Sequence, residues 1–152
     1  MRFQLELRLS AGDGVSPAMV SFRSRRMNRV VAVMTDLNMT VDGGPAPKFP
    51  LWAVYGVSDF DSTGRPVGGR AQEYESALRR ILSAHGQTED EGIPLHKLRT
   101  NLGWHVTADE CRAAIKSYEA SRQPDEPAPN AFGSKLIGFL RAAMVRDGFE
   151  VH

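Results

Sequence analysis

The chain has 152 residues, of which 41% are hydrophobic and 24% charged, and its formal net charge is +1. This composition is typical of a soluble globular protein, and no apolar run approaches the roughly 18 residues that cross a bilayer. The first residues lack the apolar core of a secretory signal, and the single Cys111 excludes an internal disulfide. The sequence therefore predicts a cytoplasmic protein.

A half-buried strand is the first element that the sequence predicts. Apolar side chains alternate with polar ones over the first nine residues, at Phe3, Leu5, Leu7 and Leu9. A repeat of two residues places these side chains on one face of a strand. Residues 11–14, which include two glycines, then predict a turn.

The stretch that follows fits two structures. Ser16 and Pro17 could begin a helix, because serine caps helices and proline is favoured in the first turn. An alternation of apolar and polar residues from Val31 to Asp42 fits a strand instead, covers more residues and is rich in β-branched types. We therefore predict a strand over about residues 29–41.

Turn-forming residues then divide the chain. Residues 43–47 predict a loop, residues 51–57 a short apolar strand, and residues 58–69 a second region of turns. The apolar spacing changes to that of helices beyond this region. The sequence therefore predicts an α+β fold with a small β-rich N-terminal region, residues 1–69, followed by a region of four helices, residues 70–152.

The four predicted helices differ in how clearly they are bounded. The first contains Tyr74 and Leu82 and ends at Gly86, and a short second one carries leucines at positions 95, 98 and 102. A proline-rich stretch at residues 123–130 separates the third helix from the last, which covers about residues 132–147. Gly148 ends the last helix, and residues 149–151 could add a terminal strand.

The third helix has the most complete start signal in the chain. Thr107 can cap it, and Glu110 three residues later completes the pattern of a capping box. Val106 and Cys111 occupy the positions of a hydrophobic staple. The helical repeat predicts a buried face with Cys111, Ala114, Ile115 and Tyr118.

Residues 71–121 resemble the winged-helix branch of the helix-turn-helix superfamily. The matching features are a first helix ended by glycine, an approach through residues 92–95, apolar positions at Leu98 and Leu102, and the capped third helix. In that family the third helix commonly enters the major groove of DNA, so the resemblance implies DNA contacts by its outward residues Arg112 and Lys116. The wing hairpin of the family is missing here.

Four arginines form the strongest electrostatic feature, at positions Arg23, Arg25, Arg26 and Arg29. Arginines hold phosphate groups by paired hydrogen bonds, so this cluster could bind a nucleic-acid backbone. Phe22 could stack on a base if its ring is exposed. A solvated loop is the alternative. Residues 1–69 carry eight basic and six acidic residues, and residues 70–152 carry eleven and twelve, which favours the N-terminal region for phosphate contact.

Asp59 and Asp61 follow the second predicted strand. Two carboxylates at a strand end can share a Mg²⁺ ion, and the string resembles the first motif of haloacid-dehalogenase-type phosphatases and the paired aspartates of archaeo-eukaryotic primases. The remaining residues contain no matching later motif. We therefore favour a turn in which aspartate side chains accept hydrogen bonds from the backbone.

These observations predict a non-enzymatic bacterial or phage accessory protein that contacts nucleic acid, alone or within a larger protein complex. The arginine cluster supplies the phosphate contacts, the helical region binds protein partners, and no cofactor or metal is expected. One alternative is a protein-binding adaptor or inhibitor without nucleic-acid contact. Another is a Mg-dependent phosphoryl or nucleotidyl transfer enzyme that uses Asp59 and Asp61.

Overall fold

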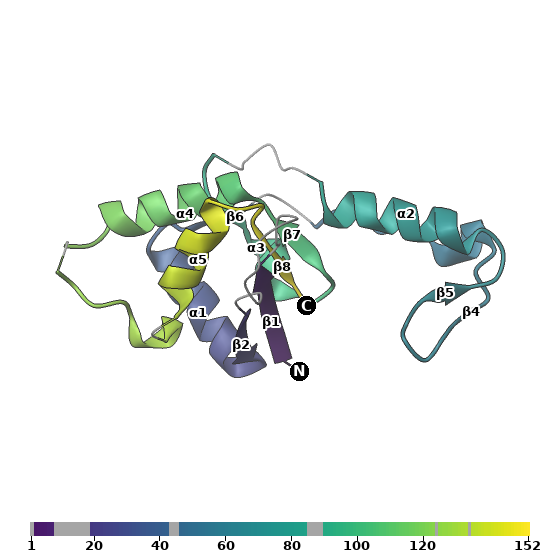
Figure 1. The fold of residues 1–152 in the computed structure, drawn as a ribbon, viewed down its shortest axis with the longest axis horizontal. Helices are drawn as coiled ribbons and strands as arrows, with labels where there is room; N and C mark the ends of the chain where they lie inside the picture. Colours follow the sequence, from purple (N-terminus) through teal and green to yellow (C-terminus); the bar gives the residue numbers. More distant parts are fainter. Residues whose placement is uncertain (1, 8–18, 43–45, 85–89, 124, 134) are drawn as a thin grey trace. The chain divides into compact units, whose positions relative to one another are not determined.

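The computed structural model describes residues 2–7, 19–42, 46–84, 90–123, 125–133 and 135–152 (Figure 1). It is a mixed α+β structure, as the sequence predicts, and it contains an antiparallel sheet. Contacts divide the chain into two compact units, one formed by Met1–Pro45 and His85–His152 and the other by Ala46–Ala84. The boundary predicted between residues 69 and 70 falls inside the second unit.

An antiparallel sheet of four strands is the framework of the first unit. In spatial order the strands are β2 (Met19–Arg23), β1 (Arg2–Leu7), β8 (Phe149–Val151) and β7 (Trp104–Val106). Every second residue of β1 is buried, which confirms the first predicted strand over Arg2–Leu7, and β8 confirms the predicted terminal strand. The sheet therefore joins two segments that lie far apart in the sequence (Figure 1).

A helix replaces most of the strand predicted over residues 29–41. This helix, α1 (Ser24–Asp36), buries Met27, Val30, Val31 and Met34, which a repeat of 3.6 residues places on one face. The end of this helix, residues 31–36, also belongs to the alternating pattern, and packing of the helical face into the core decides between the two. Only the two-residue β3 (Thr40–Val41) remains extended, in parallel pairing with β6 (Ile93–Pro94).

Three further α-helices complete the first unit. They are α3 (Leu95–Arg99), α4 (Ala108–Ala120) and α5 (Leu136–Met144), and a short 3₁₀ helix, η2 (Asn130–Phe132), precedes α5. The capped helix is confirmed as α4, since the Thr107 side chain accepts a hydrogen bond from the backbone N–H of Glu110 at 3.1 Å. Its predicted face is buried as well.

Two of the predicted helices are shorter than expected. The short helix ends at Arg99, and Leu102 beyond it is 51% exposed instead of packed, because the chain turns into β7 and pairs with β8. The last helix ends at Met144, not Asp147. Gly148 then leads into β8 with a φ of +72°, and a Cβ atom there would lie 1.9 Å from the carbonyl oxygen of Val106.

The core of the first unit lies between the sheet and its helices. Helices α1 and α5 pack against β1 and β2, and α4 packs against α5. The buried side chains of β1 and β8 meet those of the helices, and Phe139 and Phe149 stack edge to face with ring centroids 5.2 Å apart. The opposite face of the hairpin formed by β1 and β2 carries exposed residues. One face of the sheet is therefore packed, and the other is exposed at this edge.

The second unit contains a 3₁₀ helix where a strand is predicted over residues 51–57. This helix, η1 (Trp52–Tyr55), is followed by the hairpin of β4 (Asp59–Phe60) and β5 (Pro66–Val67) and by α2 (Ala71–Leu82). The ring of Tyr55 packs edge to face on Tyr74 of α2, with centroids 5.8 Å apart. The prediction of a strand was wrong because Leu51 and Val54 are 70% and 64% exposed, so no sheet buries this apolar run.

Candidate nucleic-acid interface

Arg2 of β1 and Arg23 of β2 lie directly opposite each other in the antiparallel hairpin. The neighbouring pair, Phe3 and Phe22, is buried, so the alternation of the strands turns both arginines to the exposed face. Directly opposed residues of an antiparallel pair have Cβ atoms only about 4.5–5.5 Å apart. The fold therefore places the side chains of two arginines next to each other on the exposed face of the hairpin.

The start of α1 brings a third arginine to the same place. Arg2, Arg23, Ser24 and Arg25 line a hollow of about 470 Å³, which we call the arginine hollow. The first turn of α1 contains no acidic residue. The positive end of the helix dipole adds to the charge of the arginines, so the arginine hollow favours an anion.

The other two arginines of the predicted cluster lie further along α1. Arg29 follows Arg25 by one helical turn and is exposed on the same outward side. Arg26 turns to the flank of the helix, where its guanidinium lies 5.7 Å from the ring centroid of Phe22. That ring is 4% exposed, so Phe22 does not meet the condition for stacking on a base.

The arginine hollow has little negative charge to balance it. Among the residues that the structure describes, no ion pair involves Arg2, Arg23, Arg25 or Arg29. Like charges directly opposite each other on neighbouring strands destabilise a hairpin. The hairpin thus keeps an unfavourable pair of charges that an anionic ligand would neutralise.

The two predicted site residues of α4 lie apart from the arginine hollow. The guanidinium of Arg112 forms an ion pair with Asp109 and donates a hydrogen bond to the carbonyl oxygen of Met144 at 3.1 Å. Lys116 is exposed on the same helix. Neither residue lines the arginine hollow, and Arg112 is already engaged within the protein.

The turn predicted at Asp59 and Asp61 is confirmed between β4 and β5. Oδ1 of Asp61 accepts three hydrogen bonds, from the backbone and hydroxyl of Thr63 and from the backbone of Arg65, at 2.6–2.9 Å. The hydroxyl of Thr63, followed by the backbone N–H of Arg65, lowers the pKa of Asp61. Asp59 accepts a hydrogen bond from the backbone of Phe60. Among the described residues, no group of three potential metal ligands comes together.

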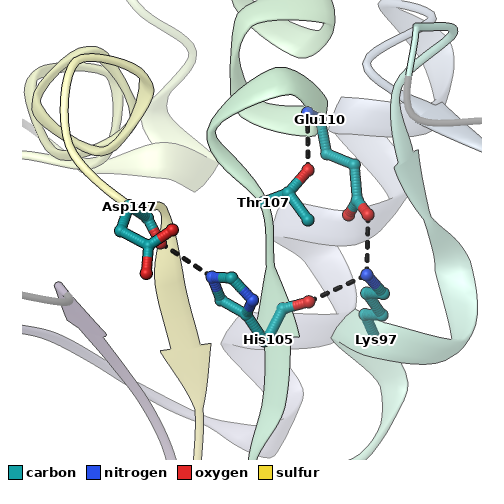
Figure 2. A network of polar contacts seen from close by, with 5 residues as sticks. All are labelled: Lys97, His105, Thr107, Glu110 and Asp147. Carbon is teal, nitrogen blue, oxygen red and sulfur yellow. Dashed lines mark hydrogen bonds and ion pairs between the residues drawn. The ribbon is translucent and has the colours of Figure 1, made fainter. Parts of the chain in front are cut away.

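A buried polar network in the first unit is absent from the sequence predictions. Figure 2 shows the ammonium group of Lys97 between the carboxylate of Glu110, at 2.6 Å, and the carbonyl oxygen of His105, at 2.8 Å. The ring of His105 contacts the carbonyl oxygen of Asp147 at 2.7 Å. This network ties α3, β7 and α4 together, and each of its side chains is buried except that of Asp147.

Sequence signals for Arg2 and Lys97 were weak. Arg2 begins the first predicted strand, but only the pairing of β1 with β2 places it opposite Arg23. Lys97 lies between two leucines of a short helix, and nothing in its spacing identifies Glu110 as its partner. Cys111 was predicted as a buried thiol, and this is confirmed, since its side chain is fully buried. That burial raises the pKa of the thiol.

Models of known protein families, curated proteins and solved structures were compared with the chain, and none of them matches it. Over the described residues, no helix combines the length and the apolar character that crossing a membrane requires.

Proposed function

We propose that this protein is a non-enzymatic accessory protein that contacts the phosphates of nucleic acid through the arginine hollow. The observation that supports the proposal best is the direct opposition of Arg2 and Arg23, with Arg25 beside them at the start of α1. An arrangement of three exposed cations is unfavourable by itself and becomes favourable when a phosphodiester neutralises it. Arginine also matches phosphate oxygens through paired hydrogen bonds.

Such contacts position a nucleic acid without reading its sequence. Phosphates are the same in every sequence, so we expect the arginine hollow to bind arbitrary oligonucleotides with similar affinity. Reading of bases by α4, which the winged-helix resemblance implies, stays a prediction. Arg112 forms an ion pair with Asp109, which makes Arg112 less suited to contact a base.

Fluorescence anisotropy with a labelled oligonucleotide tests the proposal. We expect wild-type affinity to fall steeply with salt, with a log–log slope of about −0.9 for each phosphate contact on duplex or about −0.7 on a single strand. Substitution of Arg2 and Arg23 together by Gln should flatten the slope by roughly two contacts.

The matched control removes two arginines from the second unit. Arg79 and Arg80 lie exposed on α2, and their joint substitution by Gln changes the net charge equally. This control should keep the wild-type slope. If both double variants flatten the salt dependence of the affinity equally, oligonucleotides are attracted by net charge alone, and the proposal is contradicted. Loss of binding in an Arg112→Gln variant alone would assign the contact to α4 instead.

One observation also favours protein binding by the second unit. Six large hydrophobic side chains are exposed within the 19 residues from Phe49 to Val67, out of nine in the described chain: Phe49, Leu51, Trp52, Val54, Phe60 and Val67. Monomeric proteins rarely expose large contiguous apolar patches, and such patches commonly bind other proteins. The closeness of these six residues in the sequence favours a patch of this kind. The aliphatic members of this set suit a protein partner better than nucleic acid, whose bases stack on aromatic rings.

Sedimentation velocity and co-purification test this second role. A variant with Leu51→Ser and Val54→Ser keeps the buried Tyr74 and should preserve the unit while removing its most exposed apolar groups. We expect the wild-type protein to self-associate or to retain a stoichiometric protein partner, and the variant to lose both. Identical behaviour of both proteins would exclude this surface as a docking site.

A further inference from the structure

A second cavity lies between the end of α4 and the start of α5, in the first unit. Its volume is about 520 Å³, within the range of small-molecule sites. Tyr118, Ile137 and Ala128 supply apolar wall, and Arg122, Glu126 and Arg141 supply charge. We call it the α4–α5 cavity.

Arg122 is the most deeply buried charged side chain of the α4–α5 cavity, with 8% of its surface exposed. Its guanidinium lies 5.1 Å from the ring centroid of Tyr118 and donates a hydrogen bond from Nη2 to the carbonyl oxygen of Pro127. Its Nε–H group is buried and finds no hydrogen-bond acceptor among the residues that the structure describes. Arg122 is therefore held in the cavity wall with part of its hydrogen-bonding capacity unused.

The carboxylate of Glu126 does not satisfy this arginine. Oε1 of Glu126 lies 3.7 Å from Nη2 of Arg122, beyond hydrogen-bonding distance, and its side chain is 50% exposed. A buried charged donor without an acceptor costs free energy. The Nε–H group is closed off from the cavity, so a ligand would reach the guanidinium through its Nη atoms, where Glu126 is only loosely paired. Arg141 is paired with Glu119 at 3.4 Å on the rim. Arg122 thus remains the cation that an anionic ligand can bind.

We propose that the α4–α5 cavity binds a small organic carboxylate. The ligand's carboxylate accepts hydrogen bonds from the Arg122 guanidinium and displaces the loosely paired Glu126 toward solvent. Its apolar body packs on Ile137 and Ala128. The α4–α5 cavity and the arginine hollow share no lining residue, and the inference does not depend on nucleic-acid binding.

Benzoate is a suitable probe, with benzamide as its neutral counterpart of nearly the same shape. Titration of the ¹⁵N-labelled full chain, followed by amide chemical shifts, should show benzoate binding with a Kd on the order of 1 mM, as expected for about nine heavy atoms. Benzamide should bind roughly tenfold more weakly or worse, because it lacks the charge that Arg122 recognises. The shifts should concentrate on residues that line the cavity.

Two variants should change the affinity in opposite directions. Arg122→Gln should abolish benzoate binding, whereas Glu126→Gln should tighten it several-fold, because the competing carboxylate of the protein is gone. If Arg122 had only a structural role, Glu126→Gln would not increase the affinity for benzoate. Arg79→Gln, in the second unit, is the matched control and should bind benzoate as the wild-type protein does.

A third variant keeps the test valid if Arg122→Gln unfolds the chain between α4 and α5. Ala128→Trp fills the α4–α5 cavity from an exposed position and leaves Arg122 in place, so it should block benzoate while the amide spectrum stays native. Equal binding of benzoate and benzamide would overturn the proposal. So would shifts outside the cavity residues, or unchanged affinity in both Glu126→Gln and Ala128→Trp.

Discussion

The ammonium group of Lys97 lies 2.6 Å from the carboxylate of Glu110, and the two side chains are 3% and 0% exposed. They join α3 to α4 inside the first unit, where water cannot compensate for the loss of either partner. Desolvating two charges is costly, and their attraction offsets that cost only while both are present. We therefore expect the pair to specify how the two helices meet more than it adds net stability.

This arrangement predicts strong coupling between the two positions. Lys97→Met should lower the free energy of unfolding by about 3–5 kcal/mol, because it leaves the Glu110 charge buried without its cation. The double variant Lys97→Met and Glu110→Leu should recover most of that loss. Urea denaturation of the single and double variants measures the coupling. Additive losses would show that the two side chains do not act as a pair.

The opposed arginines predict a conflict between stability and binding. Arg2→Gln should raise the free energy of unfolding by about 0.2–1 kcal/mol at low salt, because it relieves the repulsion with Arg23. The gain should shrink as salt screens the two charges. Lys116→Gln removes one exposed cation from α4 and should show no such gain. A loss of stability in Arg2→Gln at every salt concentration would contradict the repulsion.

Gly148 is predicted to tolerate no side chain. Its φ of +72° is unfavourable for other residues, and an added Cβ would lie 1.9 Å from the carbonyl oxygen of Val106. Gly148→Ala should therefore destabilise the first unit by at least about 2 kcal/mol, through strain and displacement of β8 from β7. Gly138→Ala is the control, since a Cβ at that position meets no atom within 4 Å. Chemical denaturation compares the two variants.

Asp61 should make the stability of the second unit depend on pH. Hydrogen bonds from Thr63 and Arg65 lower its pKa from the ordinary 3.8. A lowered folded-state pKa contributes stability that is present above pH 3.8 and is lost as the pH falls through the folded value. Thermal melts from neutral to acidic pH should show this loss in the wild-type protein and a smaller one in Asp61→Asn. If the melting temperatures of the two proteins fall equally as the pH is lowered, the charge of Asp61 does not stabilise the turn.

Added Mg²⁺ tests the alternative of a metal-dependent enzyme. Oδ1 of Asp61 already accepts three hydrogen bonds from its own turn. We therefore expect Mg²⁺ or Mn²⁺ to leave the melting temperature almost unchanged. A metal that binds only the native state must raise it. A clear rise that disappears in Asp61→Asn would support the metal-dependent alternative.

Local signals in the sequence predicted the structure correctly where residues close in the sequence determine it. The alternation at Phe3, Leu5 and Leu7 identified β1, because a strand has one repeat and one buried face. The cap at Thr107 identified the start of α4, since the donor and the acceptor lie three residues apart. The Asp61 turn is equally local. Spacing alone also showed that Arg23, Arg25, Arg26 and Arg29 lie close in the sequence, but it did not show that Arg2 joins Arg23 and Arg25.

Tertiary structure decided what local patterns left open. Residues 31–36 satisfy both a helical and an alternating pattern, and burial of Met27, Val30 and Met34 in the core selects the helix. The partners of Arg23, Lys97 and Arg122 come from strand pairing and from the folding of the chain around buried charges. Composition and spacing specify which residues carry charge, but only the packed fold determines which charges face each other and which are removed from water.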